Sequence, residues 1–550
     1  MATSHTASVD LAPSGIMNHR GDGHLPLADR IAWLLRSNRL LDPHQRWTRA
    51  KSFAAAFRGG SWSSPTTESR ISRWETAAVR PTHQAVVRYE ELLDLPSGTL
   101  TAVIDTLHRY AAPPGHGPPA LTRRLPAPAE AAGRIDELLD RALSTALMTG
   151  PQWDELSVLI SAQPNLIISP RSARDALADR LLHEMIVAHG LQWQQRFEAF
   201  NRLIAHPSCQ QAAVAACAGH GNDPKNQVFI ETLSALDGTA HPDASRHVLA
   251  QLHRPTNDRA FLGALLACAR KIRFGHFTAE QLTDLTTLIV DLVLEPAHHT
   301  EARPLAAALL RHAPNLHRPG VQAALRRAAA DDRTVGEVVA TGQLAAPQTA
   351  RVVVTRIVNA ATAALPYEMT NDVFPVLVRE LLFHPLFDIR LYTAMLIAAT
   401  PYREPLARAL ADELAAIRAP DRVDLNSCII SALRTFGTGE QRPLIERISI
   451  GTGLPGPLVV LATHAIGHLG GQSDDRYWAT AVDHHNRLWR RHRDPLHESA
   501  LRGLVYGLGI ARREALLGRL RLDPAAPEPA RTAADWWLGL PRHVTASAVH

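Results

Sequence analysis

The stretch FPVLVRELLFHPLFDIRLYTA, residues 374–394, predicts the fold class of most of this chain. Apolar residues recur at helical spacing on both sides of a central His-Pro pair, and a proline at that point cannot continue a helix. We therefore expect two helices joined by a short turn, with Asp388 able to cap the second helix and Ala394 allowing close helix packing. Similar segments, separated by breaks that contain Pro, Gly or Asp, continue through residues 131–541 without strand-type alternation. The sequence predicts an all-α protein.

The two helices of this stretch are similar to a HEAT repeat, and weaker versions of the pattern surround Pro207, Pro296 and Pro495. The resemblance implies an α-solenoid of degenerate helix pairs over residues 131–541, roughly eight to ten pairs of about 40–47 residues each. Residues 542–550 would then form a tail. A tetratricopeptide array is the main rival, but its period of about 34 residues is not found in this sequence.

Length and composition agree with this prediction. The chain has 550 residues, of which 46% are hydrophobic and 5% aromatic, so a wholly disordered protein is excluded. Only three of its 58 basic residues are Lys, and this richness in Arg suggests a bacterial source with a GC-rich genome. The four Cys are too widely spaced for a zinc or redox motif, so we expect buried, reduced thiols.

No stretch of the sequence approaches the roughly 20 apolar residues of a membrane-spanning helix. Residues 1–24 are polar and lack the apolar core of a signal peptide. We expect these residues to form a disordered tail, the protein to be cytoplasmic, and no membrane to be among its partners.

Positive charge is concentrated near the N-terminus. Residues 25–110 contain twelve basic and eight acidic residues, and within residues 46–80 seven basic residues face only two acidic ones. Such a concentration is expected of a surface that contacts phosphates. A solvated charged face is the alternative interpretation, and the spacing of the neighbouring residues must decide between them.

Short amphipathic helices are predicted at 27–40, 48–57, 67–76, 82–93 and 97–110. Ile71 and Trp74 are three residues apart, so both can face a core while the intervening side chains of their helix face outward. Because so small a domain needs large apolar side chains, we expect the four Trp of this segment to be core residues rather than a base-stacking platform. They are Trp33, Trp47, Trp62 and Trp74.

The string SRISRWET at 69–76, followed by Arg80-Pro81 and an apolar run at 86–95, resembles a helix-turn-helix module of the Cro/phage-repressor (XRE) class. The resemblance covers residues 25–112. Two departures are that Ala77 stands where the family prefers Gly and that the connection at 58–66 is longer than usual. In this family the residue equivalent to Glu75 supports the fold, so no DNA contact is assigned to it. The resemblance implies a transcriptional regulator that binds double-stranded DNA.

An α-helix fits the major groove, where side chains near its N-terminus reach the base edges and flanking basic residues contact phosphates. We therefore predict base contacts from Glu68, Ser69 and Arg73. The predicted phosphate contacts are Arg46, Arg49, Lys51, Arg70 and Arg80. One such module contacts few bases, so we expect a homodimer on two half-sites about one helical turn apart.

Residues 113–130 contain six Pro, which predicts a semi-extended linker between two independently folded parts. No phosphate-binding loop, nucleophile elbow or kinase motif occurs. The densest His cluster lacks HExxH spacing and is interleaved with Arg, so we predict no metal and no cofactor. It comprises Asp483, His484, His485, His492 and His497.

These observations favour a non-enzymatic, nucleoid-associated transcriptional regulator whose repeat region senses an effector or mediates dimerisation. The effector could be a peptide, a protein or a small molecule on the concave face of the solenoid. One alternative is a scaffold or adaptor of a defence or plasmid-maintenance system, in which DNA binding is autoregulatory. A less favoured alternative is a helical-repeat DNA-processing enzyme, such as a glycosylase with one catalytic Asp.

Overall fold

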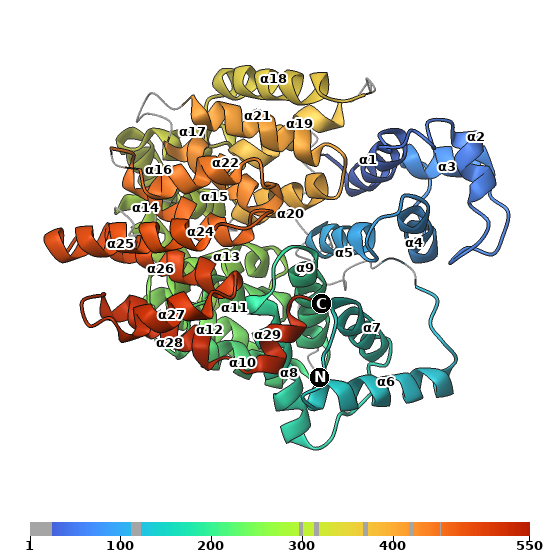
Figure 1. Cartoon of the computed structure of the whole chain (residues 1–550), viewed down its shortest axis with the longest axis horizontal. Helices are drawn as coiled ribbons and strands as arrows, with labels where there is room; N and C mark the ends of the chain where they lie inside the picture. The colour runs from blue at the N-terminus through green and yellow to red at the C-terminus, as the bar shows by residue number, and fades with distance from the viewer. Residues whose placement is uncertain are drawn as a thin grey trace, which may run out of the picture.

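The structure is a computed structural model that describes residues 25–111, 121, 123–295, 301–312, 318–366, 372–416, 423–451 and 453–550. Within these residues the chain forms α-helices and short 3₁₀ turns and contains no β-strand, which confirms the predicted all-α fold (Figure 1). None of the described helices is both long and apolar enough to cross a membrane. The predicted tail at 1–24 and linker residues 113–120 and 122 lie outside the described part.

The N-terminal module, residues 25–111, contains five helices whose bounds agree with the predicted ones to within two residues. They are α1 (Leu27–Leu40), α2 (Ala50–Ala56), α3 (Glu68–Glu75), α4 (His83–Leu92) and α5 (Thr99–Ala111). Five aromatic rings form the centre of this module, with neighbouring ring centroids 4.8–6.3 Å apart. The rings belong to Phe53, Phe57, Trp62, Trp74 and Tyr89.

The repeat array, residues 123–550, consists of antiparallel neighbouring helices. Its first part comprises α6 (Pro128–Leu143), α7 (Gly150–Ser161), α8 (Arg171–Val187), α9 (Gly190–Ala205), α10 (Gln210–Asn222), α11 (Ile230–Ser234), η1 (Ala235–Gly238), α12 (Pro242–His253), α13 (Asp258–Arg273), α14 (Ala279–Leu294), α15 (Ala302–His312), α16 (Pro319–Asp331), α17 (Arg333–Thr341) and α18 (Pro347–Ala363). Helix α6 starts inside the predicted linker, because a proline in the first turn of a helix loses no hydrogen bond.

The second part comprises α19 (Val373–Phe383), α20 (Phe387–Ala398), α21 (Arg403–Ala415), α22 (Val423–Phe436), α23 (Arg442–Ser449), α24 (Gly456–Ala465), η3 (Ile466–His468), α25 (Asp475–His492), α26 (Pro495–Ile510), α27 (Glu514–Leu522), α28 (Glu528–Gly539) and α29 (Arg542–Ser547). The two helices expected within residues 374–394 are α19 and α20. Successive pairs begin at Val373, Arg403, Arg442 and Asp475, so each is shorter than the expected 40–47 residues.

The end of the array meets its beginning, so the solenoid closes into a ring. Helix α29 contacts α8, and the fully buried guanidinium of Arg196 donates hydrogen bonds to the carbonyl oxygens of Met148 and Ser547. The Gly150 N–H donates to the His550 carbonyl oxygen at 3.3 Å. The predicted tail at 542–550 is therefore not free, because it contains α29 and its Val544, Ser547 and Ala548 are buried (Figure 1).

Helix α1 attaches the N-terminal module to the array. The indole of Trp33, which is 4% exposed, stacks on Phe374 and Tyr402 with centroids 6.3 and 5.5 Å apart. A buried ion pair joins Arg30 to Glu380 at 2.7 Å. Trp33 is thus a core residue, as predicted, but the core is shared with the array. Figure 1 shows α2 and α3 at the end of the module that points away from the array.

Candidate functional site

Helix α3 presents the three predicted base-contacting residues at its exposed face. The Thr67 hydroxyl caps the helix by accepting a hydrogen bond from the Arg70 N–H at 3.3 Å. Ile71 and Trp74 are buried in the module, as their spacing predicted. The side chains on the opposite face are therefore free to contact a groove, and they include Glu68, Ser69 and Arg73.

All five predicted phosphate-contacting residues are exposed, and four of them lie on α2, α3 or the segments beside them without an ion pair to any described residue, namely Arg49, Lys51, Arg70 and Arg80. The guanidinium of Arg70 lies over the rings of Trp62 and Trp74, 5.1 and 5.5 Å from their centroids. Arg46 differs, because it forms ion pairs with Asp42 at 3.0 Å and Asp94 at 2.7 Å. Arg46 faces the array and its charge is compensated, so the structure does not bring it together with the other four.

Glu75 holds α3 against α1 and α4. Its carboxylate accepts two hydrogen bonds of 2.7 Å from the Arg39 guanidinium and one of 3.0 Å from the Tyr89 hydroxyl. Burial and the adjacent carboxylate raise the pKa of Tyr89 well above its usual value, so its hydroxyl stays protonated and donates. Glu75 is 6% exposed, and its contacts stabilise the fold of the module.

The turn after α3 adopts the backbone conformation that glycine favours. Ala77 has φ +61°, in the left-handed region, where an L-residue with a Cβ is disfavoured by about 1–2 kcal/mol. Similar modules have Gly at this position. Ala77 differs from them in residue type, but the turn keeps the left-handed geometry that Gly favours.

Ala77→Gly is expected to raise the stability of the N-terminal module by about 0.5–1 kcal/mol, because it relieves the left-handed strain. Thermal unfolding of the full chain, with hydrogen exchange of α3, measures the change. Ala78→Gly is the matched control: residue 78 is not among the positive-φ positions, so this change should be neutral or destabilising. Equal effects of the two substitutions would contradict the assigned strain.

The long connection between α2 and α3 is attached to α4. The backbones of Gly59 and Trp62 pair through two hydrogen bonds of 2.7 and 2.9 Å. Arg88 donates to the Phe57 carbonyl oxygen at 2.9 Å, and the Glu91 carboxylate accepts from the Ser61 N–H at 3.1 Å. These hydrogen bonds hold the long connection against α4. The orientation of α3 is therefore defined despite the extra length.

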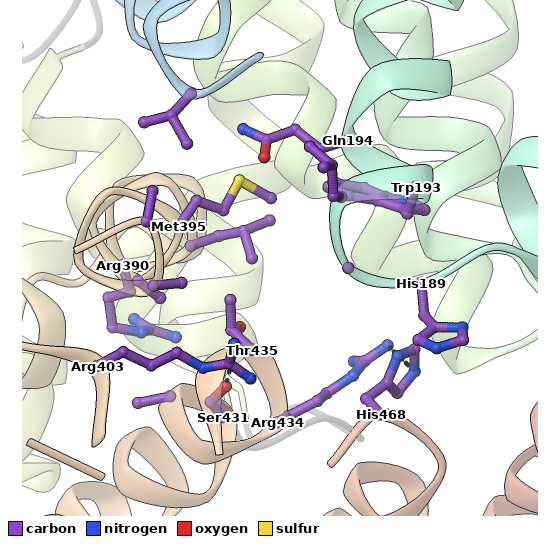
Figure 2. Close-up of a pocket in the computed structure, with 18 of the residues that line it drawn as sticks. His189, Trp193, Gln194, Arg390, Met395, Arg403, Ser431, Arg434, Thr435 and His468 are labelled. Atoms are coloured by element: carbon purple, nitrogen blue, oxygen red, sulfur yellow. Dashed lines mark hydrogen bonds between the residues drawn. The ribbon is translucent and has the colours of Figure 1, made fainter. Parts of the chain in front are cut away.

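A cavity of about 880 Å³ lies inside the ring. Residues of α9, α11 and α13 line one wall, and residues of α20, α22 and α24 line the other. The N-terminal module closes part of it with Asn38, Asp42, Arg46 and residues 93–96. Figure 2 shows side chains of distant helices converging on this space, among them Trp193, Arg403, Arg434 and His468.

Arg434 lies beside His468 in one part of the cavity wall. Arg434 donates a hydrogen bond to His468 Nε2 at 3.2 Å and lies 3.7 Å from the Glu231 carboxylate. Burial and Arg434 hold the pKa of His468 well below its usual range. Burial, together with Arg502 and Arg434, lowers the pKa of Arg259 to about 10. Of these cations only Arg434 lines the cavity, where Glu231 opposes its charge.

An acidic residue marks another part of the wall. Asp388 does not cap α20, as its sequence position suggested, because the helix begins at Phe387 and its cap residue is Leu386. Its carboxyl group instead lines the cavity, where burial and the charge of Asp237 raise its pKa to about 7. Sequence reasoning missed the cavity because its lining residues come from helices hundreds of residues apart, although several of them, including Phe387, Asp388 and Arg390, lie within the motif at 374–394.

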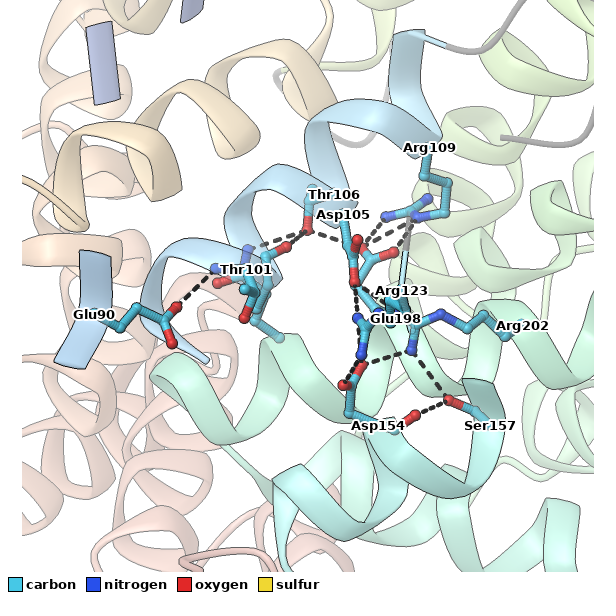
Figure 3. A network of polar contacts seen from close by, with 12 residues as sticks. Glu90, Thr101, Asp105, Thr106, Arg109, Arg123, Asp154, Ser157, Glu198 and Arg202 are labelled. Carbon is cyan, nitrogen blue, oxygen red and sulfur yellow. Dashed lines mark hydrogen bonds and ion pairs between the residues drawn. The ribbon is translucent and has the colours of Figure 1, made fainter. Parts of the chain in front are cut away.

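A buried polar network joins α5 to α9 and α7 (Figure 3). The Glu198 carboxylate accepts from the Arg109 guanidinium at 2.9 Å and from the Thr106 hydroxyl at 2.8 Å. Asp105 and Asp154 are bridged by Arg202, with distances of 2.6 and 2.7 Å. Ion pairs this deeply buried need well-defined geometry, so they hold α5 in one orientation on the array. This packing differs from the predicted pair of independently folded parts.

Within the network, Arg123 ties the linker to the array. It forms ion pairs with Asp105 and, at 2.6 Å, with Asp154. In Figure 3 the Glu90 carboxylate reaches the N-terminus of α5, where it accepts from the N–H groups of Leu100 at 2.7 Å and Thr101 at 2.9 Å. The Glu90 cap and the Arg123 ion pairs together hold α5, the helix that connects the N-terminal module to the cavity wall.

The predicted His cluster is engaged in local hydrogen bonds. His485 Nε2 lies 2.7 Å from the Ser449 carbonyl oxygen, and its Nδ1 lies 3.1 Å from His497 Nδ1. A different group, Asp179, His183 and His220, brings three potential metal-ligating atoms within 4.8 Å of one another. His183 Nδ1 also lies 2.9 Å from the Asp179 carbonyl oxygen, so that nitrogen already has a backbone partner.

Known proteins give no independent assignment of these sites: no family model matches the chain, and no curated protein matches it.

Proposed function

We propose that this chain is a sequence-specific, double-stranded-DNA-binding transcriptional regulator of the Cro/phage-repressor type, whose repeat array senses an effector. The observation that carries the proposal is the capped, exposed N-terminus of α3, flanked by the exposed cations Arg49, Lys51, Arg70 and Arg80. A helix of this kind can enter the major groove while the flanking bases neutralise phosphates. Glu68, Ser69 and Arg73 are the proposed base contacts.

The position of the cavity supports the sensing role. The same N-terminal module carries α3 and contributes residues 93–96 and Asn38 to the cavity wall. A ligand that changes how the module sits on the ring would change DNA affinity, and DNA would change ligand affinity by the same factor. In this proposal a homodimer in the bacterial cytoplasm, associated with the nucleoid, places two copies of α3 on neighbouring half-sites.

Arg73→Ala is expected to reduce discrimination between an operator and a random duplex by about 1–3 kcal/mol, because it removes a bidentate contact to guanine. Lys51→Ala should weaken binding to both duplexes equally and lower the salt slope by about 1, because a phosphate contact carries no sequence information. Fluorescence anisotropy with both duplexes over a range of salt concentrations measures these effects. Equal binding of all sequences by the intact protein would contradict specific recognition.

Chromatin immunoprecipitation with sequencing finds the operator and separates the regulator from the scaffold alternative. Many bound promoters are expected of a regulator, whereas binding confined to the protein's own promoter would favour autoregulation by a scaffold. A footprint that covers two half-sites about 10 base pairs apart is expected of the proposed homodimer.

A further inference from the structure

We propose that Asp179 and His183 of α8, together with His220 of α10, bind a zinc ion and leave one of its coordination positions to water. The inference goes beyond the proposed function and does not depend on DNA binding. It departs from the sequence-based prediction of no metal, which rested on the densest His cluster, at 483–497.

Helix α8 supplies two of the three ligands. Asp179 and His183 are four residues apart, so their side chains share one face of the helix. Ala178, Leu181 and Leu182 on the same helix are buried, which fixes α8 in the array. The Asp179 and His183 side chains remain 55% and 23% exposed, so an ion from solution can reach them.

His220 completes the set from the last turn of α10. Helices α8 and α10 pack against each other (Figure 1), and the rings of His183 and His220 meet edge to face with centroids 4.4 Å apart. The buried side chain of Asn226 donates to the His220 carbonyl oxygen at 3.0 Å and to the Val228 carbonyl oxygen at 3.1 Å. These hydrogen bonds hold the backbone of His220 in place beside α8.

The donor atoms have the separations that zinc requires. One potential ligand atom from each of the three residues lies within 4.8 Å of the other two. His183 Nδ1 lies 3.3 Å from Asp179 Oδ2, and His220 Nε2 lies 3.4 Å from Asp179 Oδ1. Two ligands bound tetrahedrally to one zinc ion, at about 2.0–2.1 Å, are about 3.3–3.4 Å apart. A normal N–H···O hydrogen bond is shorter, about 2.7–3.2 Å, so a bridging ion fits these two contacts better than a proton.

The carboxylate of Asp179 is available to a metal ion. Within the described residues it forms ion pairs with the two histidines and with no lysine or arginine. The adjacent Arg180 points into the array, where it pairs with Glu184 at 2.9 Å and donates to the Ala142 carbonyl oxygen at 3.0 Å. Two imidazoles, one carboxylate and a water molecule complete the four ligands of a tetrahedral zinc ion.

One hydrogen bond opposes the site. His183 Nδ1 lies 2.9 Å from the Asp179 carbonyl oxygen, and a zinc ion bound at this nitrogen displaces the proton between them. Proton release is general in metal binding, because a ligating imidazole nitrogen must be unprotonated. A single hydrogen bond contributes far less to stability than a bound zinc ion does, so its loss leaves binding favourable.

Isothermal titration of the full chain with zinc chloride tests the site, without an affinity tag that would add histidines. One zinc ion should bind, at least about a hundredfold more tightly than magnesium, which prefers oxygen ligands in octahedral geometry. No zinc binding, or binding no tighter than that of magnesium, would overturn the proposal.

Variants locate the ion. Asp179→Asn and His220→Gln should each weaken zinc binding at least about tenfold, because even groups that only orient metal ligands contribute this much. His253→Gln is the matched control: His253 pairs with Asp284 at 2.8 Å, but these two belong to no group of three potential ligands within the described residues. Its zinc affinity should match that of the parent. Each variant must keep the parent's circular dichroism spectrum, and unchanged affinity in either folded ligand variant would contradict the three-residue site.

Hydrogen exchange gives a second readout. Zinc should slow amide exchange in α8 and α10 together, because it joins the two helices, and should leave α27 and α28 unchanged. Protection confined to other helices would place the ion elsewhere and overturn the proposal. A chain that binds zinc at this site but binds no DNA would contradict the proposed function alone.

Discussion

Glu75→Ala is expected to destabilise the N-terminal module by about 3–5 kcal/mol, because it leaves the Arg39 guanidinium buried without its counter-charge. Glu75 accepts two hydrogen bonds of 2.7 Å from that guanidinium, which also donates to the Trp47 carbonyl oxygen, and one hydrogen bond from the Tyr89 hydroxyl. Losing it would release α3 from α1 and α4 together. Hydrogen exchange of the α3 and α4 amides in the full chain measures the free energy of this opening.

Two controls separate the buried ion pair from a general effect of mutation. Glu68→Ala removes an exposed carboxylate from the same helix and should change stability by no more than about 0.5 kcal/mol. Arg39→Met combined with Glu75→Ala removes both charges and should recover much of the loss, because no unpaired charge is then buried. A double variant as unstable as Glu75→Ala alone would contradict this account.

Trp33→Ala is expected to cost about 3–5 kcal/mol, because it leaves a large cavity between α1 and the array. The indole stacks on Phe374 of α19 and on Tyr402, so its loss should increase hydrogen exchange in both α1 and α19. Trp47→Ala is the matched control. Trp47 packs on Phe53 within the module and donates to the Leu92 carbonyl oxygen, so its loss should leave α19 protected.

The same variant bears on the coupling between the two parts. In the proposed function, a module with weakened attachment should keep its base contacts, because Trp33 packs on the array and not on the exposed face of α3, and its DNA affinity should respond less to a ligand in the ring. Unchanged exchange in α19 after Trp33→Ala would show that the Arg30–Glu380 ion pair and α5 suffice to hold the module.

Local features could be predicted because short-range physics controls them. The bounds of α1 to α5 follow from apolar periodicity, and Thr67 caps α3 through its own hydroxyl. Ile71 and Trp74 are buried because residues three apart share a helix face. The outward direction of Glu68, Ser69 and Arg73 follows from the same spacing, so the candidate DNA-contacting surface was visible without coordinates.

Other features depend on partners that spacing cannot reveal. Arg46 lies in the same basic stretch as the other candidates, yet Asp42 and Asp94, which directly follows α4, compensate its charge. Trp33 was recognisable as a core residue, but its partners Phe374 and Tyr402 lie more than three hundred positions later in the chain. Asp388 occupied a plausible capping position, but α20 starts two residues earlier than such a cap requires, and the Asp388 side chain lines the cavity.

The sequence by itself determined the all-α class, the helices of the N-terminal module, the paired helices of the array and the exposed basic surface, because periodicity, caps and turns act over a few residues. Only the tertiary structure decided that the array closes into a ring at α29 and α8, that α1 and α5 pack on it, and that Arg434, His468 and Asp388 share one cavity. These outcomes depend on the small rotation between successive helix pairs, which accumulates over the whole array and is encoded in no single segment.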